Sequence, residues 1–302
     1  MQGSLSNRKG SIMHRLRVVV VVSPDLSDIY FANRLINGTN VVGIVVEKQH
    51  ETIPTRNRLM ALVRDAKSPS KLLEKIQGVT IQRYYAKKAK QIAQHGFGRE
   101  GRNLFPTEDC QVIYTEGVRA INSPQYVKAI EELQPDLIAL CGASILKEPI
   151  LGIPPRGVVN LHGGLAQKYR GLWTTLWAIY NEEPEFVGYT IHYVTPGIDD
   201  GDIICQGRPT IYKDDNHETL YVKVVKLGTE AMIKAIHDIQ NETVRSCPLK
   251  QGGRLYLGSM VTPAIVKKTW RKIRAGVIRD YAKHPKDVKL IESGKTSLLN
   301  TS

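Results

Sequence analysis

Three polar residues lie where the sequence predicts that strands end or turn. Asn160 and His162 close an apolar run. Asp199 lies in the glycine-bracketed acidic turn 197–202. Acyl transfer to an amine needs a hydrogen-bond donor for the oxyanion, a charge-stabilising group and a proton acceptor. An amide, an imidazole and a carboxylate meet these needs, so the three residues predict an acyl-transfer centre.

Each of these features, taken alone, also has a structural explanation. Asn160 and His162 are two residues apart, so they share one face of an extended strand, where polar pairs also cap the following loop. Asp and Gly are ordinary turn residues. Gly163 and Gly164 follow directly, and glycines let another molecule approach the backbone closely. These two glycines favour a binding site after the histidine.

A buried, mostly parallel sheet is the scaffold that the sequence predicts. Residues 16–22 are largely β-branched, with five consecutive valines at 18–22, which is typical of a central parallel strand. A helix that Gly38 ends and a strand at 41–46 complete a βαβ unit, without the G-x-G-x-x-G of dinucleotide sites. We expect a Rossmann-like α/β fold with helices on both faces. Further strands are predicted at 111–115, 136–141, 157–161, 187–194 and 203–212, and helices at 123–133, 173–180 and 218–240.

Residues 51–105 interrupt this alternation inside a catalytic domain predicted at 15–245. They carry twelve Lys and Arg against four Asp and Glu. Apolar spacing predicts two short amphipathic helices, around Leu59 and Leu72, and the glycines at 96–102 predict a flexible loop. A solvated basic helical insertion is the simplest interpretation, and an anion-binding or acceptor-binding flap is the alternative.

Residues 246–302 are predicted to form a small C-terminal tail. Its main feature is a basic amphipathic helix around Trp270, which we expect to dock on the parent domain. Homodimerisation through this helix stays open.

Composition limits the classes of function. The 302 residues carry a formal charge of +13, which favours anionic ligands. The four cysteines form no C-x-x-C, so neither a metal site nor a disulfide framework is expected. The polar first residues lack the core of a signal peptide, and the longest apolar run is too short to cross a bilayer. We therefore expect a cytoplasmic protein with no membrane role.

Three motifs in order form a specific combination: Asn160-Leu161-His162, Tyr169-Arg170-Gly171 and Ile198-Asp199-Asp200-Gly201-Asp202-Ile203-Ile204. This combination resembles the N10-formyltetrahydrofolate-dependent formyltransferase family, which includes glycinamide ribonucleotide, methionyl-tRNA and sugar N-formyltransferases. The resemblance covers roughly residues 16–240. It implies that Asn160, His162 and Asp199 are catalytic, with N10-formyltetrahydrofolate as co-substrate and no metal.

The resemblance also implies which residues contact ligands. The folate pterin would be lined by Ile145, Leu146, Thr195, Pro196, Gly197, Ile198 and Asp199. The acceptor side would include Gly163, Gly164, Tyr169, Arg170 and Trp173. Trp177 is a further acceptor-side candidate, but for both Trp173 and Trp177 packing against the core is the favoured interpretation. His192, in the strand before the acidic turn, is expected to be a core histidine that could also assist from beneath the pocket.

Departures from the family pattern bear on the acceptor. Gly163-Gly164 replace the usual proline and serine, and Ser23-Pro24-Asp25 stand where glycinamide ribonucleotide enzymes have a phosphate-binding glycine-serine loop. The tail is shorter than the barrel of the tRNA enzymes. We therefore expect a phosphorylated or nucleotide-linked small amine, above all an amino sugar on a nucleotide carrier. Methionyl-tRNA and glycinamide ribonucleotide are the enzymatic alternatives, and a catalytically inactive RNA-binding or scaffold protein is the non-enzymatic one. Nucleic acid is not favoured.

Overall fold

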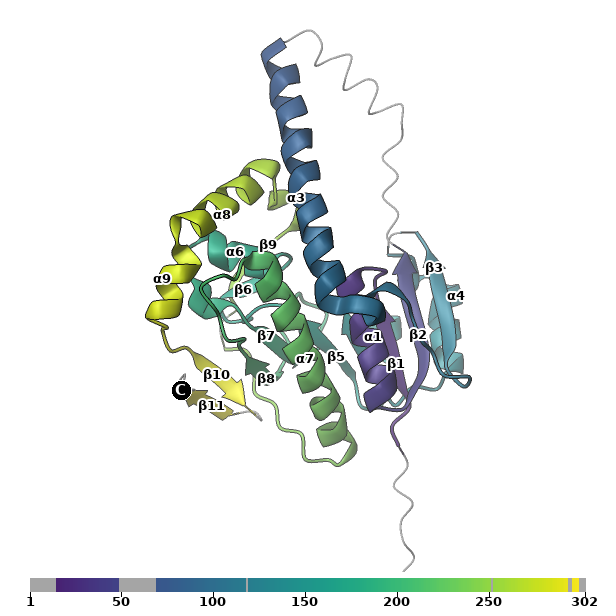
Figure 1. Ribbon diagram of the computed structural model, residues 1–302. Coiled ribbons are helices and arrows are strands. Elements are labelled where there is room, and N and C mark those ends of the chain that lie inside the picture. Colours follow the sequence, from purple (N-terminus) through teal and green to yellow (C-terminus); the bar gives the residue numbers. More distant parts are fainter. Residues whose placement is uncertain (1–14, 49–68, 118, 251, 293–294, 299–302) are drawn as a thin grey trace, which may run out of the picture.

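A seven-stranded sheet with the order β3-β2-β1-β4-β5-β7-β8 organises the protein (Figure 1). The computed structural model describes residues 15–48, 69–117, 119–250, 252–292 and 295–298. The sheet strands are β1 (Val18–Val22), β2 (Val41–Lys48), β3 (Gln111–Glu116), β4 (Leu137–Cys141), β5 (Val158–His162), β7 (Tyr189–Tyr193) and β8 (Ile203–Gly207). The pairs among β1 to β5 are parallel, and β7 and β8 add an antiparallel hairpin. The predicted α/β sheet is thus confirmed, although β8 ends before residue 212.

Helices cover both faces of this sheet. Val18, Val20 and Val22 of β1 pack into one apolar cluster with α1 (Leu26–Gly38) and α7 (His217–Gln240). Val19 and Val21 face a second cluster, which α4 and the short α5 cover. Alternation along a strand places successive side chains on opposite faces, which explains the continuous valine run. Further helices are α4 (Pro124–Glu132), α5 (Glu148–Leu151) and α6 (Thr174–Tyr180), and the short 3-10 turns are η1 (Ala120–Asn122), η2 (Pro184–Phe186) and η3 (Gly258–Met260).

The basic insertion differs from its prediction. Two helical stretches that meet at a kink, together α3 (Pro69–Arg102), replace the second short helix and the expected flexible loop at 96–102. Its one non-helical residue within that loop is Gly98, with φ 58° and ψ −140°, where the helix kinks. Phe97 is buried against Tyr30 of α1, with ring centroids 5.3 Å apart, so tertiary packing keeps this glycine-rich stretch helical. The helix predicted around Leu59 lies outside the described residues.

The C-terminal segment packs against the sheet domain. It contains β9 (Arg254–Tyr256), α8 (Pro263–Ala275), α9 (Val277–Lys283) and the hairpin of β10 (Lys289–Glu292) with β11 (Lys295–Leu298). Trp270 of α8 is 4% exposed, and its ring stacks on Tyr85 of α3 at 5.6 Å. The Lys88 ammonium lies 3.8 Å from the same indole. The basic helix therefore docks on the parent domain as expected, against α6 (Thr174–Tyr180), where Lys272 Nζ donates to the Tyr180 carbonyl at 2.7 Å, and it also packs on the basic insertion.

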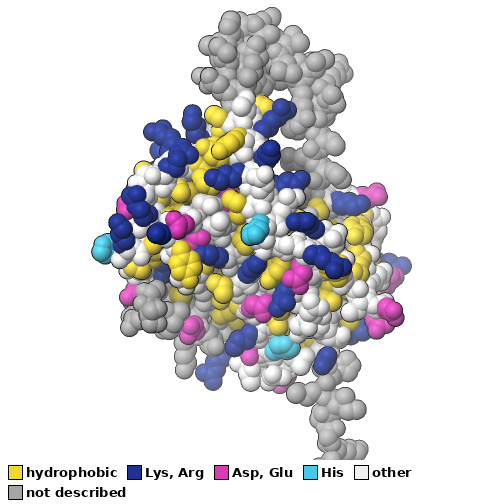
Figure 2. Space-filling view, viewed as in Figure 1, with side chains coloured by type: hydrophobic (Ala, Val, Ile, Leu, Met, Phe, Trp, Pro, Cys, Tyr) yellow, Lys and Arg dark blue, Asp and Glu magenta, His cyan; other side chains and the backbone are white. Residues whose placement is uncertain are grey.

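Positive charge gathers on α3 and α8. Figure 2 shows Lys and Arg side chains over the part of the molecule that these helices form. Residues 78–98 and 263–275 include no Asp or Glu, and their exposed cations are Arg83, Lys87, Lys90, Lys267, Lys268, Arg271 and Arg274. Both helices lie toward the end of the sheet where the parallel strands finish (Figure 1).

A carboxyl group is buried at that same end of the sheet. The Asp28 side chain is 2% exposed and accepts hydrogen bonds from Ser23 at 2.6 Å and Ser27 at 2.8 Å. The Cys141 thiol at the end of β4 lies 3.8 Å away. Burial outweighs the two hydroxyl contacts and raises the pKa of Asp28 to about 7.

This raised pKa predicts a pH-dependent stability. The ordinary pKa of the carboxyl is 3.8, so folding favours its protonated form, and stability should fall as pH rises from about 4 to about 7. A shift of three units corresponds to about 4 kcal/mol. Asp28→Asn cannot ionise, so its Tm relative to the wild type should be higher at pH 8 than at pH 5. Thermal unfolding at both pH values checks this, with exposed Asp109→Asn as control. The same Tm difference at both pH values would contradict it.

Candidate functional site

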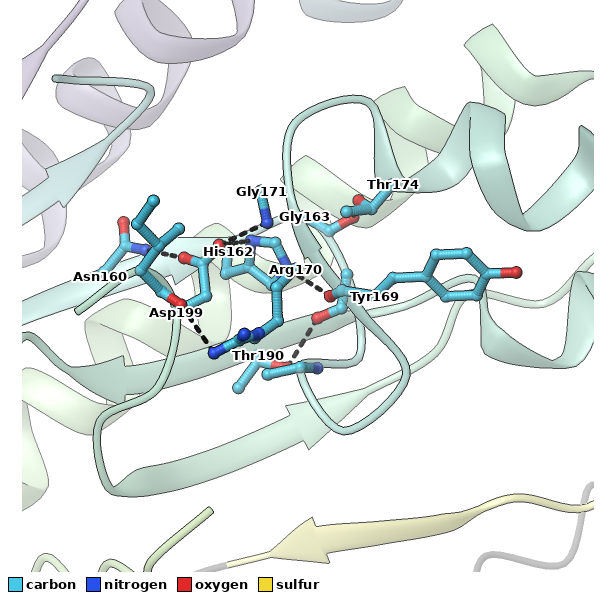
Figure 3. A network of polar contacts seen from close by, with 12 residues as sticks. Asn160, His162, Gly163, Tyr169, Arg170, Gly171, Thr174, Thr190 and Asp199 are labelled. Atoms are coloured by element: carbon cyan, nitrogen blue, oxygen red, sulfur yellow. Dashed lines mark hydrogen bonds and ion pairs between the residues drawn. The ribbon is translucent and has the colours of Figure 1, made fainter. Parts of the chain in front are cut away.

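The three predicted catalytic residues meet in one cluster (Figure 3). Asn160 and His162 are on β5, and the loop between β7 and β8 brings Asp199 back over them. His162 Nδ1 lies 3.3 Å from Asp199 Oδ2. Asn160 Nδ2 lies 3.3 Å from Asp199 Oδ1. One carboxylate therefore contacts both the amide and the imidazole.

Both nitrogens of the His162 ring are engaged. Nε2 lies 2.9 Å from the carbonyl oxygen of Tyr169, which can only accept, so Nε2 carries the hydrogen. Nδ1 faces Asp199, and the side chain is 5% exposed. The imidazole is thus held between a carbonyl and a carboxylate, an arrangement that stabilises a positive charge on the ring.

The Asp199 carboxylate is stabilised from several directions. Its side chain is 11% exposed, and the Gly171 backbone N–H donates to Oδ2 at 2.8 Å. Burial alone would raise the pKa of Asp199, but the nearby His162 imidazole and the Gly171 N–H hold it well below its ordinary value. The residue has φ 48°, a left-handed conformation that Asp adopts more readily than most residues. Asp199 therefore remains a carboxylate throughout the neutral range.

His192 also belongs to the cluster. It is 3% exposed, as expected for a core histidine, and its Nδ1 lies 2.7 Å from the Tyr193 carbonyl oxygen. Because that nitrogen must donate, Nε2 of the neutral ring is free to accept, and Asn160 Nδ2 lies 3.0 Å from it. Asp199 Oδ1 is 3.5 Å from the same nitrogen. The register of β5 with β7 places His192 directly opposite Asn160, a pairing that the sequence pattern did not reveal.

These contacts set the orientation of the Asn160 amide. The amide donates to His192 at 3.0 Å and to Asp199 at 3.3 Å, which uses both of its hydrogens. The contact with Asp199 is the longer and therefore the weaker of the two. A ligand oxygen near Asn160 would compete most easily for that hydrogen.

The glycines after His162 serve the fold in a way that the sequence did not show. A Cβ on Gly164 would lie 2.8 Å from His162 Nε2 and 2.9 Å from Thr174 Cβ, closer than real side chains come. A Cβ on Gly163 would make only ordinary contacts, 3.7 Å from Tyr221 and 4.0 Å from Thr174. Close approach of the protein's own side chains thus accounts for a glycine at position 164, and contact of Gly163 and Gly164 with an acceptor stays a prediction.

Two of the predicted acceptor-side residues have side chains committed to the protein. Tyr169 is 1% exposed, and its hydroxyl bonds Glu183 and accepts from Asn181. The Arg170 guanidinium donates to the Gly253 carbonyl at 3.0 Å and the Ile198 carbonyl at 3.3 Å. The Tyr169 hydroxyl and part of the Arg170 guanidinium are thus bonded within the protein, and contact of these two residues with an acceptor stays a prediction.

The two tryptophans behave differently. Trp173 is 54% exposed, so the core packing favoured for it is wrong. It has φ 61° and directly precedes α6. Trp177 is 6% exposed and stacks on Tyr256 at 4.6 Å, which confirms the expected core packing. A bulky residue with positive φ is strained, and such strain is concentrated at functional sites. Trp173 therefore stands out as the exposed aromatic surface next to the cluster.

The predicted pterin-lining residues lie in two loops. Leu146 is 2% exposed and packs in the apolar cluster that Val194 also contacts, at the start of the acidic loop. Ile145 is 48% exposed. Within the acidic loop, Thr195 donates to Asp200 at 2.6 Å. Their contact with a pterin remains a prediction.

The described residues contain neither a cluster of metal ligands nor a helix that could cross a membrane. Among the described residues, no three His, Cys, Asp or Glu side chains gather as a metal site would require. All four cysteines, which lie in described ranges, are free thiols. No helix in the described part of the chain is both long and apolar enough to cross a membrane.

The fold is that of solved formyltransferases. A sugar N-formyltransferase from Shewanella sp FDAARGOS_354 superposes with a TM-score of 0.51 at 15% identity, over 85% of this chain and 87% of that chain. A 4-N formyltransferase from Francisella tularensis gives 0.50 at 17% identity, over 95% and 97%. At these identities the likeness concerns the fold alone.

Residues 37–236 match the formyl transferase family, and the chain belongs to that family. A methionyl-tRNA formyltransferase of Acetivibrio thermocellus is 36% identical over 129 residues, 42% of this chain and 41% of that protein. Its counterpart in Caldanaerobacter subterraneus is 34% identical over 140 residues, 46% and 44%. The chain therefore spans less than half the length of these relatives.

The crowding at Gly164 predicts a difference between neighbouring glycines. Gly164→Ala should be destabilised by about 1–3 kcal/mol, because its methyl group displaces His162 or Thr174. Gly163→Ala should stay within about 0.5 kcal/mol of the wild type. Urea unfolding of both variants measures these changes. Equal changes in the two variants would refute the packing explanation.

Proposed function

We propose that this protein transfers a formyl group from N10-formyltetrahydrofolate to a primary amine. Membership of the formyl transferase family supports the reaction class. The observation that carries the proposal is the cluster in which the Asp199 carboxylate contacts both His162 and Asn160.

Each residue has a defined role in this mechanism. The neutral amine attacks the formyl carbon, and the carbonyl oxygen develops negative charge. Asn160 donates the hydrogen of its weaker contact to this oxyanion, which is worth roughly 3 kcal/mol for one such donor. Positive charge on His162, stabilised by Asp199, favours the same oxyanion.

Proton transfer follows from the electrostatics of Asp199. Formamide formation removes one proton from the attacking amine, and the departing N10 nitrogen gains one. The lowered pKa makes Asp199 a weak base, so it passes the proton on through water rather than keeping it. The Asp199 carboxylate therefore orients His162 and relays the amine proton.

For the co-substrate, the exposed Ile145 and the loop 195–199 are the residues we assign to the pterin. Ile145 offers an apolar surface that is 48% exposed, and Leu146 anchors its loop in the core. An apolar wall with a few polar groups suits a flat heteroaromatic ring.

We place the acceptor among amino sugars on nucleotide carriers. The exposed indole of Trp173 offers a stacking surface, and the net charge of +13 suits a phosphorylated ligand. Ser23, which stands in the position of the phosphate-binding loop of glycinamide ribonucleotide enzymes, is 3% exposed and donates to Asp28. Because the Ser23 hydroxyl is buried and bonded to Asp28, it is not available for a phosphate, which disfavours glycinamide ribonucleotide as the acceptor.

Methionyl-tRNA is the second candidate acceptor. The exposed cations of α3 and α8, on stretches without Asp or Glu, would suit a polyanion. The relatives matched over part of their length are named methionyl-tRNA formyltransferases.

Substitution of the cluster tests the mechanism. Asn160→Ala, His162→Ala and Asp199→Ala should each lower turnover by about 100-fold or more, because each removes a group that stabilises the transition state. Formyl transfer is measured alongside circular dichroism, and exposed His237→Ala is the matched control. Near-normal turnover of Asp199→Ala would remove that residue from the mechanism.

A panel of amines identifies the acceptor. Labelled N10-formyltetrahydrofolate is offered with amino-sugar nucleotides, glycinamide ribonucleotide and Met-tRNA, and the mass shift of each amine is recorded. We expect formylation of an amino-sugar nucleotide. Formylation of Met-tRNA alone would replace the sugar assignment. An absence of transfer, with no change of Trp fluorescence on adding a formylfolate analogue, would favour the non-catalytic alternative.

A further inference from the structure

The strand β6 (Tyr169–Gly171) stands between the catalytic cluster and the C-terminal segment. Only three residues long, it pairs in parallel with β9 in a two-stranded ribbon apart from the main sheet. Two-stranded ribbons are marginally stable on their own. The position of β6 therefore depends on its contacts with other segments, and so do the positions of the groups that β6 contacts.

One edge of β6 serves the catalytic cluster. The Tyr169 carbonyl accepts from His162 Nε2 at 2.9 Å, and the Gly171 N–H donates to Asp199 at 2.8 Å. Backbone groups of residues two apart point to the same side of a strand. Both contacts thus depend on the position of a single strand edge (Figure 3).

The opposite edge of β6 is bonded to the C-terminal segment. The Arg254 N–H donates to the Lys168 carbonyl at 3.1 Å, and the Leu172 N–H donates to the Tyr256 carbonyl at 2.9 Å. Residues 168 and 172 thus bond β9, while 169 and 171 bond the cluster. The ribbon transmits the position of β9 directly to His162 and Asp199.

Side chains reinforce the same connection. The Tyr256 ring stacks on Tyr169 at 5.5 Å and on Trp177 at 4.6 Å. The Asn181 amide donates to both tyrosine hydroxyls, at 2.9 and 3.0 Å. The Arg170 guanidinium joins the Gly253 carbonyl to the Ile198 carbonyl, next to Asp199.

The two segments fit without space for an added methyl group. A Cβ on Gly253 would overlap the Lys168 backbone, and one on Gly171 would overlap the Tyr256 carbonyl. A Cβ on nearby Gly258 would make only an ordinary contact, 3.4 Å from Leu172. Gly253 and Gly258 therefore form a matched pair for testing the fit.

This C-terminal segment lies beyond the family match, which ends at residue 236. We propose that residues 252–256 form a positioning element of the catalytic centre, with Gly253 and Tyr256 as positioning residues that act on His162 and Asp199 through β6. The expected loss of turnover rests on the proposed function, whereas the expected displacement of His162 and Asp199 does not.

The test compares Gly253→Ala with Gly258→Ala, and Tyr256→Ala with Tyr256→Phe, in the full chain. The ring N–H of His162 is followed by NMR and assigned by its loss in His162→Gln. In the wild type we expect a slowly exchanging Nε2–H, because Tyr169 accepts it. Gly253→Ala and Tyr256→Ala should lose or broaden this signal, while Gly258→Ala keeps it and Tyr256→Phe, which preserves the stacked ring, restores it.

Turnover provides the second readout. A displacement of about 1 Å can cost on the order of 100-fold in rate, so kcat of Gly253→Ala should fall by about that factor with KM for the folate little changed. An unchanged His162 signal in both Gly253→Ala and Tyr256→Ala would overturn the positioning role, even if formyl transfer proceeds. If the His162 signal changes in these variants but the wild type transfers no formyl group, only the proposed function is refuted. Circular dichroism excludes variants that fail to fold, and Tyr256→Ala then carries the test if Gly253→Ala is among them.

Discussion

The buried carboxylate of Asp199 is the constraint on which the site depends. A charge at 11% exposure is unfavourable unless it is paired and hydrogen-bonded. Its partners come from separate segments: His162 and Asn160 from β5, and the Gly171 N–H from β6. The charge is compensated only when these strands are assembled together, so formation of the site is coupled to formation of the fold.

The same coupling accounts for the strained backbone near the site. Asp199 and Trp173 have positive φ. Gly171, whose N–H donates to Asp199, also has positive φ. Left-handed conformations of non-glycine residues persist where surrounding contacts impose them. Here the contacts are the Gly171 bond to Asp199 and the packing of α6 behind Trp173.

Charge is distributed unevenly over the protein. The cluster itself combines one carboxylate with two imidazoles, whereas α3 and α8 present cations without neighbouring acidic residues in 78–98 and 263–275. Long-range attraction of an anionic ligand toward the end of the sheet that holds the cluster follows from such a distribution. The chemistry of the cluster is local, and the approach of its ligands is governed by the whole surface.

Local patterns were sufficient for the sheet strands, the βαβ opening, α7 and the family, because strand and helix periodicity and short motifs are properties of neighbouring residues. They also indicated Asn160, His162 and Asp199, which the structure brings together. They did not reveal that two helical stretches meet at a kink at Gly98, that Arg170 is held by backbone carbonyls, or that His192 lies opposite Asn160. Those facts depend on strand register, on packing between distant segments and on the direction of individual hydrogen bonds. Such contacts join residues far apart in the chain, so only the assembled tertiary structure decides them.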